Sequence, residues 1–396
     1  MAVSEGPYGV GVVTGARVRV LSARTSDGIA MSFAPLTHRS MVLVELETVD
    51  GLVGYGESWV NYPSWAAQER VATLCEGVLP HVVGATVDDV AATQAELVRV
   101  LDPIGRQWGA PGPVRQAISA VDVALWDLAG RAAGRSVAEL AGGRIRARTP
   151  VYASSLGPDG VREQAADCVR DGHTAVKVKI GFGRDRDTAA LADARDALGG
   201  EVTLYADANQ AWTLDDAVAM APVLREAGVA WIEEPLRGDR VAELDELHRR
   251  TGLAIATGEN VYGLGGFRVL ADSTGVAVLQ PDVTKAGGLT EALAVCRLAA
   301  ERGKVVMPHL YGGALGYAAT LQLAACAAPV SGVEYDVREN PLRDPLLRNG
   351  PTPSRGVVSI PEGPGLGVEL DHDAVDAVDA YTRSVHVTGS AHGPSA

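Results

Sequence analysis

Hydrophobic positions follow two alternating patterns between about residues 150 and 335. Short runs rich in β-branched residues predict buried strands, and the stretches between them carry apolar residues at helical spacing. Eight strands alternating with seven helical connections predict an α/β fold in which a parallel sheet closes into a TIM barrel. An open, doubly wound sheet is the alternative, but no Gly-x-Gly-x-x-Gly follows the first strand. The expected strands are 151–154, 175–180, 202–206, 230–233, 255–257, 277–280, 304–308 and 332–335.

A different pattern precedes the barrel, where alternation of apolar and polar positions predicts half-buried strands at 16–22, 41–48 and 53–57. The dipeptide Asp50-Gly51 between the last two predicts a hairpin turn. Helical periodicity follows, most clearly at 113–133. We therefore expect three parts, which are an N-terminal α+β capping domain at 1–148, the barrel at 149–345 and a C-terminal segment at 346–396 with a frayed polar end.

Charge and composition exclude several classes of function. The 396 residues include 35 basic and 49 acidic side chains, giving a net charge of −14, so no basic surface is offered to nucleic acid or to an anionic membrane. No apolar run approaches the roughly 18 residues of a membrane span, and the N-terminus lacks the pattern of a secretory signal. The four cysteines lie far apart, as reduced thiols do. We expect a cytoplasmic protein without nucleic-acid or membrane partners.

Ionisable residues recur with the period of the barrel. Seven of them lie at or just after successive predicted strands, at intervals of 28, 26, 26, 23, 27 and 25 residues. Each interval is one strand–helix unit, so all seven are expected at the carboxyl ends of the strands, where barrel active sites are built. A single acidic residue there often only caps a helix, but seven in phase indicate a site. They are Lys179, Asp207, Glu233, Glu259, Asp282, His309 and Glu334.

Three carboxylates, those of Asp207, Glu233 and Glu259, end neighbouring strands and are predicted to converge. Like charges this close repel one another unless a hard divalent cation lies between them. Oxygen ligands suit Mg²⁺, with Mn²⁺ as a substitute. The alternative is helix capping combined with arginine pairing. Glu234 is a weaker ligand candidate, because strand alternation points it to the opposite face.

Two acid/base groups are predicted on either side of this metal position. Lys177 and Lys179 lie two apart on one strand and face the same side, and their proximity is expected to depress the pKa of one of them. Asp282 lies one strand from His309 and is expected to fix the imidazole tautomer. Because the two strands lie roughly opposite in the ring, the pair suits removal of a proton next to a metal-bound carboxylate.

The motifs that carry these residues resemble those of the enolase superfamily, mandelate racemase subgroup. The resemblance covers nearly the whole chain and implies a cap domain on a modified (β/α)8 barrel, a C-terminal return to the cap at 363–368 and a homo-oligomer. The motifs are Val-Lys-Val-Lys at 176–179, Ala-Asp-Ala-Asn-Gln at 206–210, Trp-Ile-Glu-Glu-Pro at 231–235, Thr-Gly-Glu-Asn at 257–260, Gln-Pro-Asp-Val-Thr-Lys-Ala-Gly-Gly at 280–288, Met-Pro-His-Leu at 307–310 and Val-Glu-Tyr-Asp at 333–336.

The resemblance implies a role for each matched residue. Asp207, Glu233 and Glu259 match the metal ligands. Lys179 matches one general base and His309, with Asp282, the second. The remaining matches are Lys177, which holds the substrate carboxylate and lowers the pKa of Lys179, Glu334, which hydrogen-bonds the enediolate as an acid, Asn209 as a substrate contact and Lys285 behind the metal site.

The resemblance leaves the reaction open. A small carboxylate substrate is expected, and the first expectation is dehydration of an acid sugar (an aldonate or aldarate) to a 2-keto-3-deoxy acid. The alternatives are racemisation of a 2-hydroxy acid and cycloisomerisation of a sugar lactone or anhydro-sugar acid. Two further readings lie outside this chemistry, namely a Schiff-base aldolase using Lys179 and a non-catalytic ligand-binding homologue.

Specificity is expected from two loops of the cap, at 24–39 and 58–65. The first contains His38 and Arg39, which either meet a distal polar group of the substrate or are solvated. The aromatic residues of these loops are unusual for a strongly hydroxylated substrate. The hydrophobic and aromatic residues concerned are Ile29, Met31, Phe33, Trp59, Tyr62 and Trp65.

Overall fold

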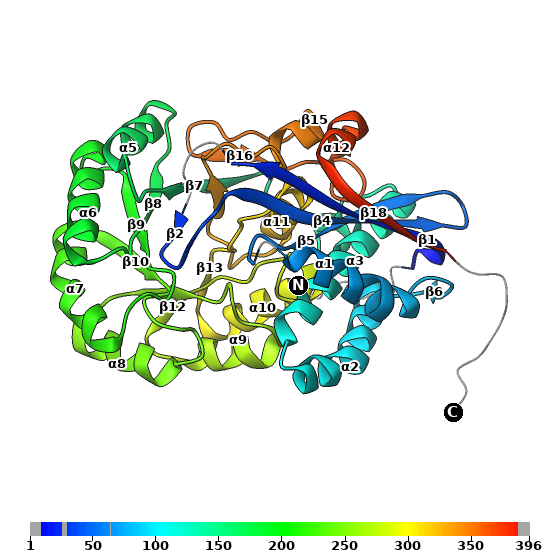
Figure 1. The fold of residues 1–396 in the computed structure, drawn as a ribbon, viewed down its shortest axis with the longest axis horizontal. Coiled ribbons are helices and arrows are strands. Elements are labelled where there is room, and N and C mark those ends of the chain that lie inside the picture. Colours follow the sequence, from blue (N-terminus) through cyan, green and yellow to red (C-terminus); the bar gives the residue numbers. More distant parts are fainter. Residues whose placement is uncertain (1–8, 26–29, 64, 387–396) are drawn as a thin grey trace.

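Two groups of elements lie side by side in the computed structural model, which describes residues 9–25, 30–63 and 65–386. The barrel, coloured green to orange, occupies the left of Figure 1, and the cap, mainly blue and cyan, occupies the right. The C-terminal strand, in red, lies with the cap. Ile29 and the polar C-terminal end lie outside the described residues.

The eight predicted barrel strands are all present and form a parallel sheet. Its order is β13-β12-β11-β10-β9-β8-β7-β14, and an isolated bridge connects Val306 of β13 to Val330, three residues before β14. The strands are β7 (Arg148–Leu156), β8 (Ala175–Lys179), β9 (Thr203–Asp207), β10 (Val229–Glu233), β11 (Ile255–Thr257), β12 (Val276–Leu279), β13 (Val305–Val306) and β14 (Val333–Asp336).

Seven helices connect successive barrel strands and cover the outside of the sheet (Figure 1). They are α5 (Val161–Arg170), α6 (Arg184–Leu198), α7 (Leu214–Glu226), α8 (Val241–Thr251), α9 (Gly263–Asp272), α10 (Gly288–Arg302) and α11 (Ala314–Cys326). In place of an eighth long helix, the chain after β14 forms the 3₁₀ turn η3 (Asp344–Leu346) and the short strands β15 (Leu347–Arg348), β16 (Val357–Ser359) and β17 (Glu369–Leu370). The barrel is therefore modified at its last unit.

An antiparallel sheet forms the base of the cap, in the order β18-β1-β4-β5. Its β18 strand comes from the C-terminal segment and pairs with β1 from Gly15–His386 to Leu21–Asp379. The predicted hairpin is present, with its turn between β4 and β5. The strands of the cap are β1 (Gly11–Arg24), β2 (Ala30–Met31), β3 (Ala34–Pro35), β4 (His38–Thr48), β5 (Val53–Trp59), β6 (Thr86–Val87) and β18 (Asp379–His386).

The helices of the cap pack on this sheet, and the long α3 lies closest to it. A Cβ atom at Gly56 of β5 would lie 1.9 Å from the carbonyl oxygen of Ala120 in α3, so only glycine permits this approach. No helix in the described residues is long and apolar enough to cross a membrane. The helical elements are α1 (Ala66–Ala72), the π-helical turn η1 (Thr73–Val78), the 3₁₀ turn η2 (Leu79–His81), α2 (Val90–Trp108), α3 (Pro111–Ala133), α4 (Val137–Leu140) and α12 (His372–Val378).

Helix α3 also joins the cap to the barrel. Asp122 accepts hydrogen bonds from the backbone N–H and the hydroxyl of Thr290, and Ser119 accepts one from the N–H of Gly287. These bonds satisfy free N–H groups at the start of α10, whose dipole favours a negative partner there. The cap is thereby fixed against the strand ends of the barrel, which position the site.

Candidate active site

The seven ionisable residues come together at the mouth of the barrel, as their spacing predicts. Lys179, Asp207 and Glu233 are the last residues of β8, β9 and β10, and Glu334 lies in β14. Glu259, Asp282 and His309 follow the ends of β11, β12 and β13 by two or three residues. Each of the seven is at most 9% exposed. Buried charges at this density must pair with one another or with a bound ion.

A strained turn after β9 holds Asp207 and Asn209. Asn209 and Gln210 have φ angles of 45° and 63°, in the left-handed region that ordinary residues avoid. The turn lets the Asn209 N–H donate to Asp207 Oδ1 at 2.9 Å. The Lys179 ammonium donates to Asp207 Oδ2 at 2.5 Å and to Asn209 Oδ1 at 3.1 Å. Asn209 therefore orients both Asp207 and Lys179.

The pKa of Lys179 is raised in the structure, whereas the proximity of Lys177 was expected to lower it. Burial and the neighbouring Lys177 lower the pKa, but Asp207, with smaller contributions from Glu233 and Glu259, outweighs them and the net pKa is raised. Spacing along β8 correctly placed the two lysines together, but it could not show that carboxylates surround both of them. In this arrangement Lys179 is a protonated partner of Asp207.

Lys177 lies deeper in the barrel than Lys179 and is fully buried. Its Nζ lies 2.7 Å from both Glu233 Oε2 and Glu334 Oε1. Burial acts against the charge of Lys177, but Glu233 and Glu334 raise its pKa well above the usual range. Burial likewise acts against the charge of Glu334, yet Lys177 brings the Glu334 pKa down to about 2. Lys177 thus favours the ionised form of Glu334, which accepts a hydrogen bond from the N–H of Leu310, and the acid role that the resemblance implies for Glu334 stays a prediction.

His309 and Asp282 form the predicted pair. His309 Nδ1 lies 2.7 Å from Asp282 Oδ2, and the other oxygen of Asp282 accepts from the N–H and hydroxyl of Thr284. On the opposite side of the ring, His309 Nε2 lies 2.8 Å from Glu259 Oε2. Burial lowers the pKa of His309, but Glu259 and Asp282 raise it to about 10. Asp282 fixes the ring so that Nε2 faces Glu259, one of the three candidate metal ligands.

The three candidate ligands fit a hard cation by their chemistry. Asp207 and Glu233 are register partners on β9 and β10, and Glu259 follows β11. Glu233 Oε1 is buried without a hydrogen-bond partner, and burial together with Asp207 raises the pKa of Glu233 to about 7. Among the described residues, however, no group of three acidic, histidine or cysteine side chains is arranged to hold a metal as it stands. The ion pairs recorded for the three carboxylates are with lysine and histidine.

Strand alternation predicts that the side chain of Glu234 points away from the site, but in the structure it points toward the site. Glu234 lies beyond the end of β10 with a φ of 39°, and its side chain lines a cavity between the cap and the mouth of the barrel. Gln210 donates to it at 2.8 Å and Asn260 at 3.1 Å. Asn260 also donates to Glu259 at 2.8 Å and accepts from Lys285 at 3.0 Å. Lys285 therefore acts on Glu259, a candidate ligand, both through Asn260 and directly, since its Nζ lies 3.6 Å from Glu259 Oε1. The sequence signal for Glu234 was the Glu-Glu-Pro segment at the end of β10.

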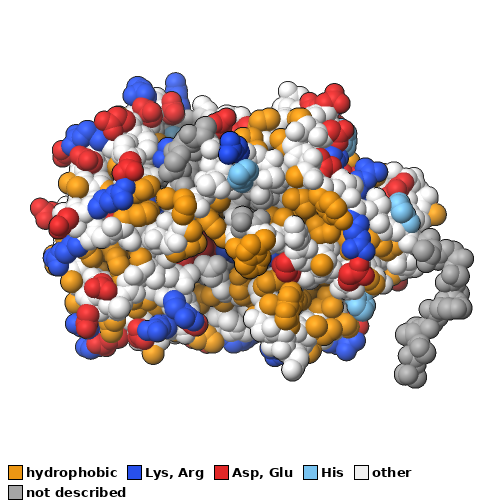
Figure 2. Space-filling view, viewed as in Figure 1, with side chains coloured by type: hydrophobic (Ala, Val, Ile, Leu, Met, Phe, Trp, Pro, Cys, Tyr) orange, Lys and Arg blue, Asp and Glu red, His pale blue; other side chains and the backbone are white. Residues whose placement is uncertain are grey.

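A cavity of about 860 Å³ lies between the cap and the mouth of the barrel. Figure 2 shows hydrophobic side chains gathered around a hollow near the centre of this face. The cap loops contribute to its lining as expected, and the Lys285 ammonium lies 4.6 Å from the centre of the Trp59 ring. The barrel residues on its wall include Lys179, Asn209, Glu259, Lys285 and His309, and the cap contributes Met31, Phe33, Trp59, Tyr62, Trp65 and Trp108.

Arg39, at the end of the first cap loop, neither meets the cavity nor is solvated, which were the two expected alternatives. Its side chain is buried, and its Nη2 lies 2.6 Å from Asp336 Oδ2 in β14, so it is neither solvated nor on the described wall of the cavity. His38 is exposed beside Thr37. The structure places Arg39 at the start of β4, and the sequence around it gives no sign of a buried acidic partner in the barrel.

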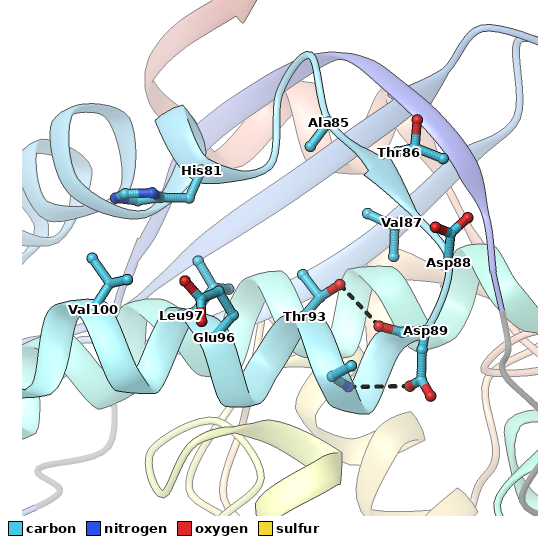
Figure 3. A pocket seen from close by; sticks show the side chains of 11 residues that line it. His81, Ala85, Thr86, Val87, Asp88, Asp89, Thr93, Glu96, Leu97 and Val100 are labelled. Carbon is cyan, nitrogen blue, oxygen red and sulfur yellow. Dashed lines mark hydrogen bonds between the residues drawn. The ribbon is translucent and has the colours of Figure 1, made fainter. Parts of the chain in front are cut away.

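A second hollow, of about 320 Å³, lies between η2, β6 and α2 (Figure 3). Its polar groups stabilise the start of α2, because Asp89 accepts hydrogen bonds from the N–H groups of Ala91 and Ala92. Thr93 donates to the backbone oxygen of Asp89. This hollow contains none of the predicted site residues.

Comparison with known proteins agrees with this geometry. Residues 15–142 match the N-terminal domain of the mandelate racemase / muconate lactonizing enzyme family, and residues 160–374 match the enolase C-terminal domain-like family. The chain belongs to the enolase superfamily. Its fold is the capped, modified barrel of the mandelate racemase and muconate lactonizing enzyme group, and it is an enzyme of that superfamily.

Individual relatives in the superfamily have different reactions. D-galactarolactone cycloisomerase of Agrobacterium fabrum is 30% identical over 378 residues, which cover 92% of this chain and 97% of the relative. Arabinonate dehydratase of Saccharolobus solfataricus is 29% identical over 354 residues, covering 87% and 92%. The structure of a racemase from Streptomyces coelicolor with bound magnesium superposes with a TM-score of 0.84 at 25% identity, covering 93% of this chain and all of that one.

Proposed function

We propose that this enzyme removes the proton next to the carboxylate of an acid sugar and dehydrates the sugar to a 2-keto-3-deoxy acid. The observation that carries the proposal is the position of two acid/base groups in one cavity. Lys179 ends β8 and His309 follows β13. On the strands between them, Asp207 and Glu233 end β9 and β10, and Glu259 follows β11. A substrate held at the carboxylates therefore has one such group on either side.

Each residue has a defined part in this reaction. Lys179 must first lose the proton that its pairing with Asp207 favours, and it then accepts the proton as the C2–H bond breaks. The C3–O bond then breaks as His309 protonates the departing hydroxyl, which leaves as water, and the enol product tautomerises to the 2-keto-3-deoxy acid. Asp282 holds the His309 ring in the orientation for this transfer, because its carboxylate lies 2.7 Å from Nδ1.

Asp207, Glu233 and Glu259 are the residues that would hold Mg²⁺, or Mn²⁺ in its place. When bound, the ion supplies positive charge that stabilises negative charge developing on the substrate carboxylate. Asn209 orients Asp207 and Lys179 from the cavity wall, and Lys285 supports Glu259 through Asn260. Lys177 is proposed to bind the substrate carboxylate, and Glu334 to hold the Lys177 ammonium in place. Both residues lie deeper in the barrel than the residues that line the cavity.

Cycloisomerisation of a sugar lactone or anhydro-sugar acid is the second candidate. The aromatic wall supplied by Phe33, Trp59 and Tyr62 suits a compact ring better than an extended, fully hydroxylated chain. The similarity to D-galactarolactone cycloisomerase supports the same candidate. Racemisation of a 2-hydroxy acid would use Lys179 and His309 as bases on opposite faces.

The substrate proposed in each case is a small carboxylate, and we further propose a cytoplasmic homo-oligomer. If the enzyme were instead an aldolase that forms a Schiff base on Lys179, borohydride would reduce that Schiff base and leave the carbonyl substrate attached to Lys179, without any need for metal. A non-catalytic binding homologue would have no use for two opposed acid/base groups, which both line the cavity.

The test is proton NMR of the enzyme in D₂O with Mg²⁺ and a panel of aldonates, aldarates, 2-hydroxy acids and sugar lactones. A 2-keto-3-deoxy product formed from an aldonate or aldarate with loss of water supports the proposal. Deuteration at C2 with formation of the epimer assigns racemisation, and loss of a lactone without loss of water assigns cycloisomerisation. Borohydride trapping without metal dependence would overturn the whole account.

A further inference from the structure

The loop that carries His309 is held by a side chain of the cap. This loop runs from the end of β13 to the start of α11, and Tyr311 lies two residues beyond His309. Asn61, which follows β5, donates from its side-chain nitrogen to the backbone oxygen of Tyr311 at 2.9 Å. Its side-chain oxygen accepts from the N–H of Ser40 at 2.9 Å. Asn61 thus connects the cap sheet directly to the His309 loop.

A second cap residue holds the far end of the same loop. Glu57 in β5 is fully buried, and its two carboxylate oxygens accept from the N–H groups of Gly313 at 2.5 Å and Gly316 at 2.8 Å. These N–H groups lie at the start of α11, where the helix dipole favours a negative partner. The loop is also packed tightly here, since a Cβ atom at Gly313 would lie 2.1 Å from the sulfur of Met41 in β4.

The barrel holds the loop from the other side. Glu334 accepts from the N–H of Leu310 at 3.0 Å, and Asn340 donates to the backbone oxygen of Gly312 at 3.0 Å. The backbone that follows His309 is therefore fixed between two domains. By contrast, the hydrogen bonds that the structure records for Lys179 go to Asp207 and Asn209, which are both barrel residues.

We propose that Asn61 and Glu57 are positioning residues through which the cap sets the place of the His309 imidazole. This rests on the proposed function, because it takes His309 as an acid/base group. Proton transfer needs donor and acceptor within about 2.6–3.2 Å, and a displacement of about 1 Å can lower a rate about 100-fold. Asn61 lies between Trp59 and Tyr62, which line the cavity, so a movement of this cap loop also acts on His309.

The test compares Asn61→Ala and Glu57→Gln with Gln322→Ala in the magnesium-loaded protein. Gln322 is a matched control because it lies in α11, is fully buried and bonds the N–H of Ala138 and the backbone oxygens of Pro361 and Leu366, away from the loop. The probe is nitrogen-15 NMR of labelled histidine, with His309→Asn used to assign the signal.

We expect Asn61→Ala and Glu57→Gln to shift the His309 ring signals and weaken the low-field Nδ1 proton shared with Asp282. Gln322→Ala should leave both unchanged while lowering stability. Asn61→Asp is the second variant if Asn61→Ala does not fold, because it keeps the acceptor for Ser40 and removes the donor to Tyr311. Unchanged His309 signals in a folded Asn61 variant would overturn the inference, whatever the enzyme's reaction.

A kinetic measurement separates this inference from the proposed function. The substrates are the C2 epimers D-gluconate and D-mannonate, whose C2 protons point to opposite faces. Deuterium incorporation at C2 of the recovered substrate is followed in D₂O, as a partial reaction in which Lys179 faces the C2 proton of one epimer and His309 that of the other. Asn61→Ala should lower exchange on the His309 side about 100-fold and leave the Lys179 side at the wild-type rate. Equal losses on both sides would show a general structural role and contradict the inference. Absence of both exchange and dehydration in wild type, with shifted His309 signals in the variant, would count against the proposed function alone.

Discussion

Arg39 of the cap and Asp336 of the barrel form an ion pair in which Arg39 Nη2 and Asp336 Oδ2 lie 2.6 Å apart and each side chain is 3% exposed. These two atoms make no aligned hydrogen bond, and the guanidinium also lies 4.9 Å from the centre of the Tyr311 ring. The pair therefore joins β4 to β14 beside the His309 loop. The attraction between its two charges is strengthened because both side chains are buried.

We expect removal of either partner of this pair to destabilise the protein strongly. Arg39→Met leaves the Asp336 carboxylate buried without its counter-charge, and loss of one partner of a buried pair costs about 3–5 kcal/mol. Urea unfolding of Arg39→Met, Asp336→Asn and the double variant measures this. The double variant should be more stable than the sum of the single losses predicts, because neither charge is then left alone. Additive losses would show that the two charges do not interact.

Asp122 should make stability depend on pH. Burial raises the pKa of Asp122 from 3.8 to about 7, against hydrogen bonds from Thr290 that lower it. Between these values the folded state binds more protons than the unfolded state, so stability falls as the pH rises. One linked proton corresponds to at most about 1.4 kcal/mol per pH unit. The stabilisation of the folded state by protonated Asp122 is fully present below pH 3.8 and is lost by about pH 7.

The measurement for Asp122 is the free energy of unfolding of wild type and Asp122→Asn at several values between pH 4.5 and 8. Asparagine keeps the shape of the carboxyl group and does not ionise, so the variant should gain stability relative to wild type as the pH rises. Taking the difference between the two proteins removes the contributions of other titrating groups. A difference that does not change over this range would show that Asp122 has an ordinary pKa.

Magnesium should stabilise the protein through the three carboxylates at the strand ends. Asp207, Glu233 and Glu259 repel one another, and Glu233 Oε1 has no hydrogen-bond partner. A ligand present at 100 times its dissociation constant stabilises a folded protein by about 2.7 kcal/mol. Thermal unfolding with EDTA and with excess Mg²⁺ should therefore differ in wild type. Glu233→Gln should reduce this shift, and Asp122→Asn, which is remote from the carboxylates, should retain it.

The sequence predicted the barrel and its mouth because both follow from local periodicity. Strand period, helix period and the interval of one strand–helix unit place Asp207, Glu233 and Glu259 in register without any knowledge of distant contacts. All seven periodic residues lie at the mouth for the same reason. The His309–Asp282 pair follows from the adjacency of β12 and β13.

Features that depend on contacts between domains were not predictable in this way. The partner of Arg39 lies almost 300 positions along the chain, in β14. The direction of Glu234 depends on a left-handed turn beyond the strand, where alternation no longer applies. The raised pKa of Lys179 depends on the balance between burial and surrounding carboxylates, which spacing on one strand does not contain.

Lys179 and His309 should act on opposite faces of the substrate. Lys179→Ala and His309→Asn are each expected to lower C2 proton exchange by about 10²–10⁴-fold for one epimer of a substrate pair, because general acid–base catalysis contributes about that much. Deuterium incorporation at C2 of the recovered D-gluconate and D-mannonate, followed by NMR, gives the rate of this partial reaction for each epimer separately. Both variants should still show the thermal shift with Mg²⁺, since neither residue is a proposed ligand. Undiminished exchange of both epimers by Lys179→Ala would remove Lys179 from the reaction, and equal loss of both epimers in each variant would show that the two residues do not act on separate faces.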